Sequence, residues 1–174
     1  HIENIFKKGV KVFVFSNPNN PTGIVYSNDT INKIAKLSEK YNITLVIDQL
    51  YSRMLYSGES YTHLCSCDTL PKSILTIMGP SKTESLSGFR LGVAFGTSRL
   101  IERMESLQAI VSLRASGYNQ AALNTWFNEP KGWINDRVRK HEKIRDELLK
   151  VFRNGGLQTT TPQAGSYLFP KLPQ

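Results

Sequence analysis

The fold is decided by the stretch Gly79-Pro80-Ser81-Lys82-Thr83-Glu84-Ser85-Leu86-Ser87-Gly88-Phe89-Arg90-Leu91-Gly92, which follows the apolar run 74–78. That run has the length and composition of a buried strand, so Lys82 lies in a glycine- and serine-rich loop directly after a strand. A lysine at such a junction is held in place, and partial desolvation makes its amine lose a proton more easily. Such an amine can form a Schiff base with an aldehyde.

Arg90 lies eight residues beyond Lys82 in the same loop. Its guanidinium is permanently charged and presents a planar fork that suits phosphate. An imine-forming lysine beside a phosphate-binding arginine suggests pyridoxal phosphate, which carries both an aldehyde and a phosphate. A basic loop with two unrelated cations is the alternative, and the loop alone does not decide between the two.

Two earlier stretches also place polar side chains directly after apolar runs. They are Ser16-Asn17-Pro18-Asn19-Asn20-Pro21-Thr22-Gly23, after the run 10–15, and Val46-Ile47-Asp48-Gln49-Leu50-Tyr51. The segment 29–41 between them has the apolar spacing of a helix, with Ser27 or Asn28 as its cap. Strand, helix and strand then form a right-handed crossover with parallel strands. Ligands bind at the carboxyl ends of such strands, so we expect Asn20 and Asp48 to converge on one site.

Both residues also have a simpler interpretation. An Asp after a strand is most often a turn or cap residue, and Asn/Pro/Gly stretches usually mark plain loops. Because X-Pro bonds take the cis form at modest cost, the Asn20-Pro21 bond is predicted to be cis.

The remaining pattern completes an α/β fold. A third strand is predicted at 73–78 and a fourth at 91–96, antiparallel to its neighbour because no helical segment separates the two. Helices are predicted at 98–113, 118–127 and 131–153, and the last ends at Gly155-Gly156. Residues 52–72 are predicted to be an irregular connection.

In their order and spacing, the three polar stretches resemble the class I/II aminotransferases, the fold-type-I pyridoxal-phosphate-dependent enzymes. The resemblance implies part of the large cofactor-binding domain over residues 1–130, with its three-layer, mostly parallel sheet. It implies an interdomain helix and the beginning of a small α+β C-terminal domain over 131–174. It also implies transfer of an amino group between an amino acid and a 2-oxo acid, by a homodimer.

The resemblance assigns roles to matching residues. Lys82 would form the Schiff base with pyridoxal phosphate and then move a proton between the substrate and the cofactor. Asp48 would keep the pyridine nitrogen protonated. Asn20 and Tyr51 would donate hydrogen bonds to the phenolic oxygen of the ring and lower the pKa of the lysine–cofactor imine. Arg90 would bind the phosphate, so the implied catalytic residues are Lys82, Asp48 and Tyr51.

Two residues depart from the family pattern. Gly79 stands where the family commonly has a phosphate-contacting serine, and Ser81 or a backbone N–H could take over that contact. Glu84 stands where an aromatic or small residue is common, and its position near the lysine brings an acid towards a dianionic phosphate.

The chain is expected to be a fragment. It begins with His1 rather than methionine and ends at Gln174, just after a strand-like segment, and the resemblance covers about the middle of the family's chain. The stacking aromatic residue, a phosphate-binding turn and the substrate-carboxylate arginine of the family lie outside it. We therefore expect negligible transamination by these 174 residues alone.

Composition limits the other function classes. The net charge is +8, but the basic residues are scattered or alternate with acids, so no nucleic-acid partner is expected. No apolar run approaches the roughly 20 residues of a membrane span, so no membrane partner is expected. Cys65 and Cys67 are separated by one serine and lack partners for a metal site. A cytoplasmic location and no metal are the expectations.

Two alternatives remain open. A pyridoxal-phosphate-dependent lyase would keep the same fold and catalyse β-elimination, because a fold does not determine a reaction. A non-catalytic or degenerate cofactor-binding remnant would keep the framework without turnover.

Overall fold

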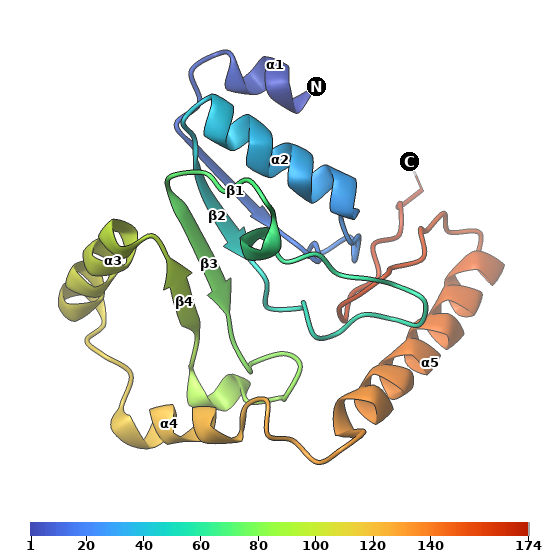
Figure 1. Cartoon of the computed structure of the whole chain (residues 1–174). Helices are drawn as coiled ribbons and strands as arrows, with labels where there is room; N and C mark the ends of the chain where they lie inside the picture. Colours follow the sequence, from blue (N-terminus) through green and yellow to red (C-terminus); the bar gives the residue numbers. More distant parts are fainter. Residues whose placement is uncertain (174) are drawn as a thin grey trace.

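One mixed sheet with the strand order β1-β2-β3-β4 organises the chain (Figure 1). In this computed structural model, which describes residues 1–173, the strands are β1 (Val12–Ser16), β2 (Thr44–Asp48), β3 (Ile74–Met78) and β4 (Val93–Gly96). The first three are parallel, and β4 pairs antiparallel with β3. The predicted α/β class, the mostly parallel sheet and the reversed last strand are confirmed.

Helix α2 (Asn28–Lys40) covers one face of this sheet. Its apolar side chains are completely or almost completely buried, as are Leu45 and Ile47 on the facing side of β2. Ser27 is the cap, because its side chain accepts a hydrogen bond from the Thr30 backbone N–H. The short helix α1 (Ile2–Phe6), which the sequence pattern did not indicate, adds Phe6 to the same core.

Helix α3 (Ser98–Val111) begins a third layer on the other face. Its Ile101 and Met104 line a cavity together with Ile77 of β3 and Ala94 of β4. These strand residues point away from α2, because Ile77 is in register with Asp48 rather than with the buried Ile47. The layer stops there. Under β1 the sheet face is bare, with Val12 52% and Val14 64% exposed.

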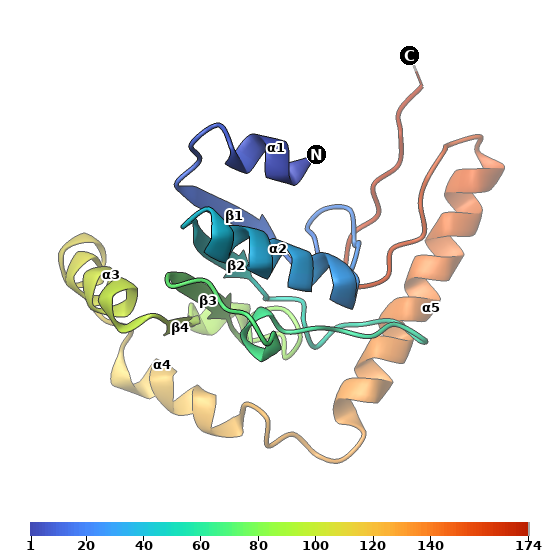
Figure 2. The same cartoon turned by 45° about the horizontal axis from the view of Figure 1, so that its top comes forward.

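From α3 to the end of α5 the chain is mainly helical and leads away from the sheet. The predicted helix at 118–127 is shorter, with α4 at Gly117–Ala121 followed by a 3₁₀ turn at Ala122–Thr125. Helix α5 (Trp133–Asn154) begins after Gly132 and ends at Gly155, as predicted. In both views the sheet lies between α3, at the left beside β4, and α5, at the right (Figures 1 and 2). Two further 3₁₀ turns lie at Leu64–Ser66 and Ser87–Phe89.

After α5 the chain returns to the sheet. The Gln163 and Ala164 N–H groups both donate to the Gly23 carbonyl, at 2.8 and 3.0 Å. Within residues 157–173 the pairing is limited to the isolated bridges Leu55–Ala164 and Gln158–Lys171, rather than a regular strand. The division into domains near residue 130 falls in the connection before α5 and stays a prediction. No helix within residues 1–173 is long and apolar enough to span a membrane.

Candidate active site

The carboxyl ends of β1, β2 and β3 lie at one edge of the sheet. Asp48 is the last residue of β2, and it is in register with Ser16 on one side and Ile77 on the other. Its carbonyl accepts a hydrogen bond from the Asn17 N–H at 3.0 Å. Its side-chain Oδ1 accepts another from the Leu50 N–H at 3.0 Å. Asp48 is therefore held in the middle of this edge, between the Asn20 turn and the Lys82 loop.

The Asn20 turn folds back over the end of β1. The Asn20 N–H donates to Ser16 Oγ at 3.3 Å, and the exposed Asn20 side chain lies next to this strand end. The predicted cis bond at Asn20-Pro21 is confirmed, and Asn17-Pro18 is a second cis bond that was not predicted. Gly23 ends the turn with φ +71°, where a Cβ would lie 2.4 Å from Pro162 Cβ. Only glycine fits at this position.

Tyr51 lies just behind Asp48 and is buried. Its ring packs edge-on against Tyr167, with 5.8 Å between the ring centroids, and it lies beside Gly165. Burial raises the pKa of the Tyr51 phenol, and Tyr167 and the negative charge of Asp48 raise it further. The Tyr51 phenol therefore keeps its proton at neutral pH.

The Lys82 loop leaves the end of β3. The Glu84 and Leu86 N–H groups both donate to the Pro80 carbonyl, and Ser81 Oγ donates to the Leu91 carbonyl at 3.3 Å. The Lys82 side chain is exposed, whereas the neighbouring Thr83 is buried. The loop thus has an anchored backbone and presents the lysine at its surface.

Helix α5 and Arg90 complete the surroundings of this loop. Arg137 of α5 donates to the Lys82 carbonyl at 3.3 Å and to the Ser85 hydroxyl. Arg90 has a left-handed backbone with φ 52°, and its guanidinium donates to the Ser87 carbonyl at 2.9 Å. In this chain Arg90 is exposed and bound to its own loop.

Gly79 has a steric explanation. A Cβ there would lie 3.0 Å from the Leu91 carbonyl oxygen and 3.3 Å from both Gly92 Cα and Leu50 Cδ2. A serine at this position would push the loop away from the turn that follows Asp48. The glycine that departs from the family pattern therefore allows the Lys82 loop to pack closely against the turn after Asp48.

The acid at position 84 is explained by an ion pair that the sequence pattern did not indicate. Its carboxylate is buried against Arg53, which also forms a two-pronged ion pair with Glu129 at 2.8 and 2.9 Å. Burial raises the pKa of Glu84, and the Arg53 charge opposes that rise. The Arg53 hydrogen bonds lower the pKa of Glu129 to about 2. The sequence analysis did not identify Arg53, although it is the only charged residue between Tyr51 and Tyr56.

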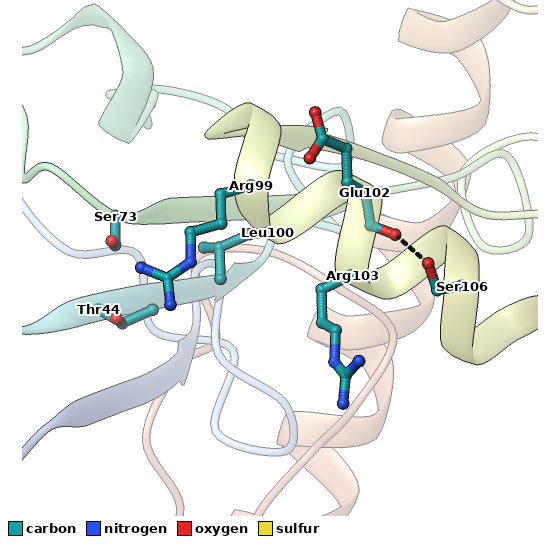
Figure 3. Close-up of a pocket in the computed structure, with 7 residues that line it drawn as sticks. All are labelled: Thr44, Ser73, Arg99, Leu100, Glu102, Arg103 and Ser106. Carbon is teal, nitrogen blue, oxygen red and sulfur yellow. Dashed lines mark hydrogen bonds between the residues drawn. The ribbon is translucent and has the colours of Figure 1, made fainter.

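A separate cavity of about 540 Å³ lies at the opposite ends of the strands (Figure 3). It is lined by Thr44 at the start of β2, Ser73 before β3, and residues of α3. Figure 3 shows the Arg99 guanidinium pointing towards Thr44 and Ser73. This cavity contains none of the residues described above.

The chain is an α/β protein whose polar residues lie at the carboxyl ends of parallel strands, where ligands bind in such folds. The family model for aminotransferase class I and II matches residues 1–174. The chain belongs to this family, whose members depend on pyridoxal phosphate.

Individual relatives agree with this assignment. An aspartate aminotransferase of Bacillus sp. (strain YM-2) is 28% identical, over 98% of this chain and 44% of that protein. Kynurenine–oxoglutarate transaminase 3 of Homo sapiens is 25% identical, over 96% of this chain and 38% of that protein. The crystal structure of an aspartate aminotransferase from Rhodobacter sphaeroides 2.4.1 is 59% identical with a TM-score of 0.96, covering 99% of this chain and 45% of that one. The chain spans less than half the length of each of these relatives.

Proposed function

We propose that the complete polypeptide containing this chain transfers an amino group between an amino acid and a 2-oxo acid, with pyridoxal phosphate held by Lys82. Membership of the aminotransferase family supports the reaction class. The observation that carries the proposal is the shared edge of the sheet, where the Asn20 turn, Asp48 and the Lys82 loop leave neighbouring parallel strands.

The donor set at this edge fits pyridoxal phosphate. It offers a carboxylate held by a backbone N–H at Asp48, a protonated phenol at Tyr51 and an exposed amine at Lys82. When bound, the cofactor supplies an electron sink that stabilises negative charge at the substrate Cα.

Each residue has a defined task in this proposal. The Lys82 amine holds the cofactor and then moves the proton to and from the substrate Cα. The Asp48 carboxylate holds a proton on the pyridine nitrogen, since two opposite charges in a partly dry site favour each other. The Tyr51 hydroxyl and the Asn20 amide donate hydrogen bonds to the phenolic oxygen of the ring.

Phosphate binding is assigned to Arg90 and Ser81. Arg90 is exposed and hydrogen-bonded only to a backbone carbonyl of its own loop among residues 1–173, so its charge is available to an anion. Ser81 takes the place of the serine that Gly79 excludes.

The chain alone is proposed to lack turnover. The exposed Lys82 side chain supports this, because the amine is open to solvent in this chain. We propose a cytoplasmic homodimer for the complete protein, by analogy with the family.

Cofactor attachment can be tested on the complete polypeptide. After incubation with pyridoxal phosphate it should be yellow, bleach on borohydride reduction, and carry the reduced cofactor on Lys82 in a peptide map. Lys82→Ala should abolish the label, and Lys72→Ala, at the other end of β3, should not. A colourless wild-type protein would contradict the proposal and favour the non-catalytic remnant.

The reaction can be tested with and without an acceptor. Keto-acid production from an amino acid should depend on an added 2-oxo acid, because the amino group must leave on a second substrate. Production without any acceptor would identify a β-elimination lyase instead.

A further inference from the structure

A buried group of three charges lies next to the Lys82 loop. We name it the Arg53 cluster; it consists of Arg53, Glu84 and Glu129. The side chains are only 20%, 6% and 13% exposed, respectively. The Arg145–Glu142 pair of α5 is buried to a similar degree, at 12% and 17%, whereas Arg114–Glu105 lies at the surface, at 75% and 61%.

The cluster joins three segments that are distant in sequence. Arg53 lies two residues after Tyr51, Glu84 lies two residues after Lys82, and Glu129 lies in the connection that leads to α5. The guanidinium thus holds together the segment that carries the phenol and the loop that carries the amine.

The geometry of Arg53 is fixed from several directions. Its two terminal nitrogens donate to the two oxygens of Glu129, and Nη1 also donates to Glu84. The Phe127 ring lies over the guanidinium at 4.3 Å, and the Phe127 N–H donates to Glu129 at 3.1 Å. A planar fork engaged in this way has one orientation, which a flexible lysine would not reproduce.

We propose that Arg53 and Glu84 are positioning residues that set the separation of the Tyr51 phenol and the Lys82 amine. The inference rests on the proposed function, since it assigns Tyr51 and Lys82 to one cofactor. A buried ion pair is weak evidence of stability, and in some proteins it selects one arrangement of the chain; we assign that role to this cluster.

The loop has few other tethers of this kind. Ser81 holds it through a long hydrogen bond of 3.3 Å. Arg137 contacts it at the exposed surface, to Lys82 and Ser85. Without the Glu84 anchor, the backbone around Lys82 would open more often, and the loop that carries the amine would no longer keep one position relative to the segment that carries the phenol.

The test uses Glu84→Gln and Arg53→Lys in the complete polypeptide, with Glu105→Gln and Arg114→Lys as controls from the exposed pair. Without cofactor, hydrogen exchange of the amides of residues 82–88 should be about tenfold faster in the two test variants. With cofactor, the pH midpoint of the visible absorbance should rise by about one unit, because the donor to the ring oxygen is displaced. The controls should change neither quantity.

The outcomes separate this inference from the proposed function. If wild-type Lys82 takes the borohydride label but Glu84→Gln leaves exchange and midpoint unchanged, the positioning role is wrong and the proposed function stands. A lower melting temperature without those two changes would also overturn it. If Lys82 of the wild type takes no label, the proposed function fails and the inference fails with it. Should Arg53→Lys not fold, Glu84→Gln decides alone, since it keeps the shape of the side chain.

Discussion

Gly79 has almost no free space around its Cα. A Cβ on Gly79 would lie 3.0 Å from the Leu91 carbonyl oxygen and 3.3 Å from Leu50 Cδ2. The close packing at this edge of the sheet therefore favours glycine at position 79, where the family commonly has a serine. Introducing that serine should harm the fold even though it restores the family residue.

We expect Gly79→Ser to lower the free energy of unfolding by about 1–3 kcal/mol, the usual cost of overpacking. Urea titration of the complete polypeptide measures this. Gly88→Ser is the matched control in the same loop, because a Cβ there meets nothing within 4 Å; its effect should stay within about 0.5 kcal/mol. Equal losses in both variants would contradict the steric explanation.

Glu129 should make stability depend on pH. Its folded-state pKa is lowered from 4.5 to about 2 by Arg53. A depressed carboxyl pKa stabilises the fold above the unfolded pKa, and this stabilisation is lost as the pH falls from about 4.5 towards 2. Glu84 acts in the opposite direction: because burial raises its pKa, its contribution declines as the pH rises above the ordinary value.

The Glu129→Gln variant should therefore lose about 2 kcal/mol near neutral pH, the range for a charged hydrogen bond. The difference from wild type should shrink steadily below about pH 4.5. Unfolding titrations over this pH range provide the measurement. A difference that does not change with pH would show that the ion pair is not its origin.

Helix α5 is joined to the rest of the chain by Arg145. This side chain is 12% exposed. It donates to the Pro162 carbonyl at 3.0 Å and pairs with Glu142 at 3.3 Å. Its guanidinium lies 4.3 Å from the Tyr56 ring centroid. One arginine thus connects the helix to the segment after Tyr51 and to the returning C-terminal segment.

Arg145→Met should cost about 2–3 kcal/mol of unfolding free energy, because the Pro162 carbonyl loses its donor and the Tyr56 ring loses the guanidinium, while Glu142 keeps only its Ser57 donors. Arg139→Met is the control on the same helix, since Arg139 is 72% exposed, and it should cost less than about 0.5 kcal/mol. Thermal unfolding followed by circular dichroism would reveal the contrast. Similar melting temperatures for both variants would argue against this anchoring role.

Sequence patterns predicted the local elements more successfully than the long-range contacts. Strands, α2 and α5 were placed within a residue or two, because apolar spacing and capping act locally. The helix at 118–127 was overestimated because its apolar residues do not reach a core; Tyr118 is 79% and Phe127 60% exposed. The site roles remain predictions. The pairing of Arg53 with Glu84 was not predictable, because no periodic pattern in the sequence links two charges that lie 31 positions apart.

At the scale of the whole molecule, one face of the sheet is left open at β1. The bare face under β1 exposes Val12 and Val14, whereas Phe13 and Phe15 on the other face of β1 pack against the core. Soluble monomers rarely leave such a contiguous apolar surface open. In the complete polypeptide we expect this face to be covered.

Val14→Lys tests this expectation. In the 174-residue chain it should change stability by less than about 0.5 kcal/mol, since Val14 is 64% exposed. In the complete polypeptide it should cost about 3 kcal/mol or more, because a charge would be buried without a partner. Phe13→Lys, on the packed face, should be damaging in both. A neutral Val14→Lys in the complete polypeptide would show that this face is open there too.

The contact of Gly23 with Gln163 and Ala164 orders events during synthesis. The Gly23 carbonyl at the end of the Asn20 turn receives both of its N–H donors from Gln163 and Ala164, about 140 positions later. A ribosome must therefore translate almost all of this chain before Gly23 can make these contacts. Until then a nascent chain can form α2 and the first two strands, which depend on nearby residues, but the Asn20 turn lacks its long-range contact.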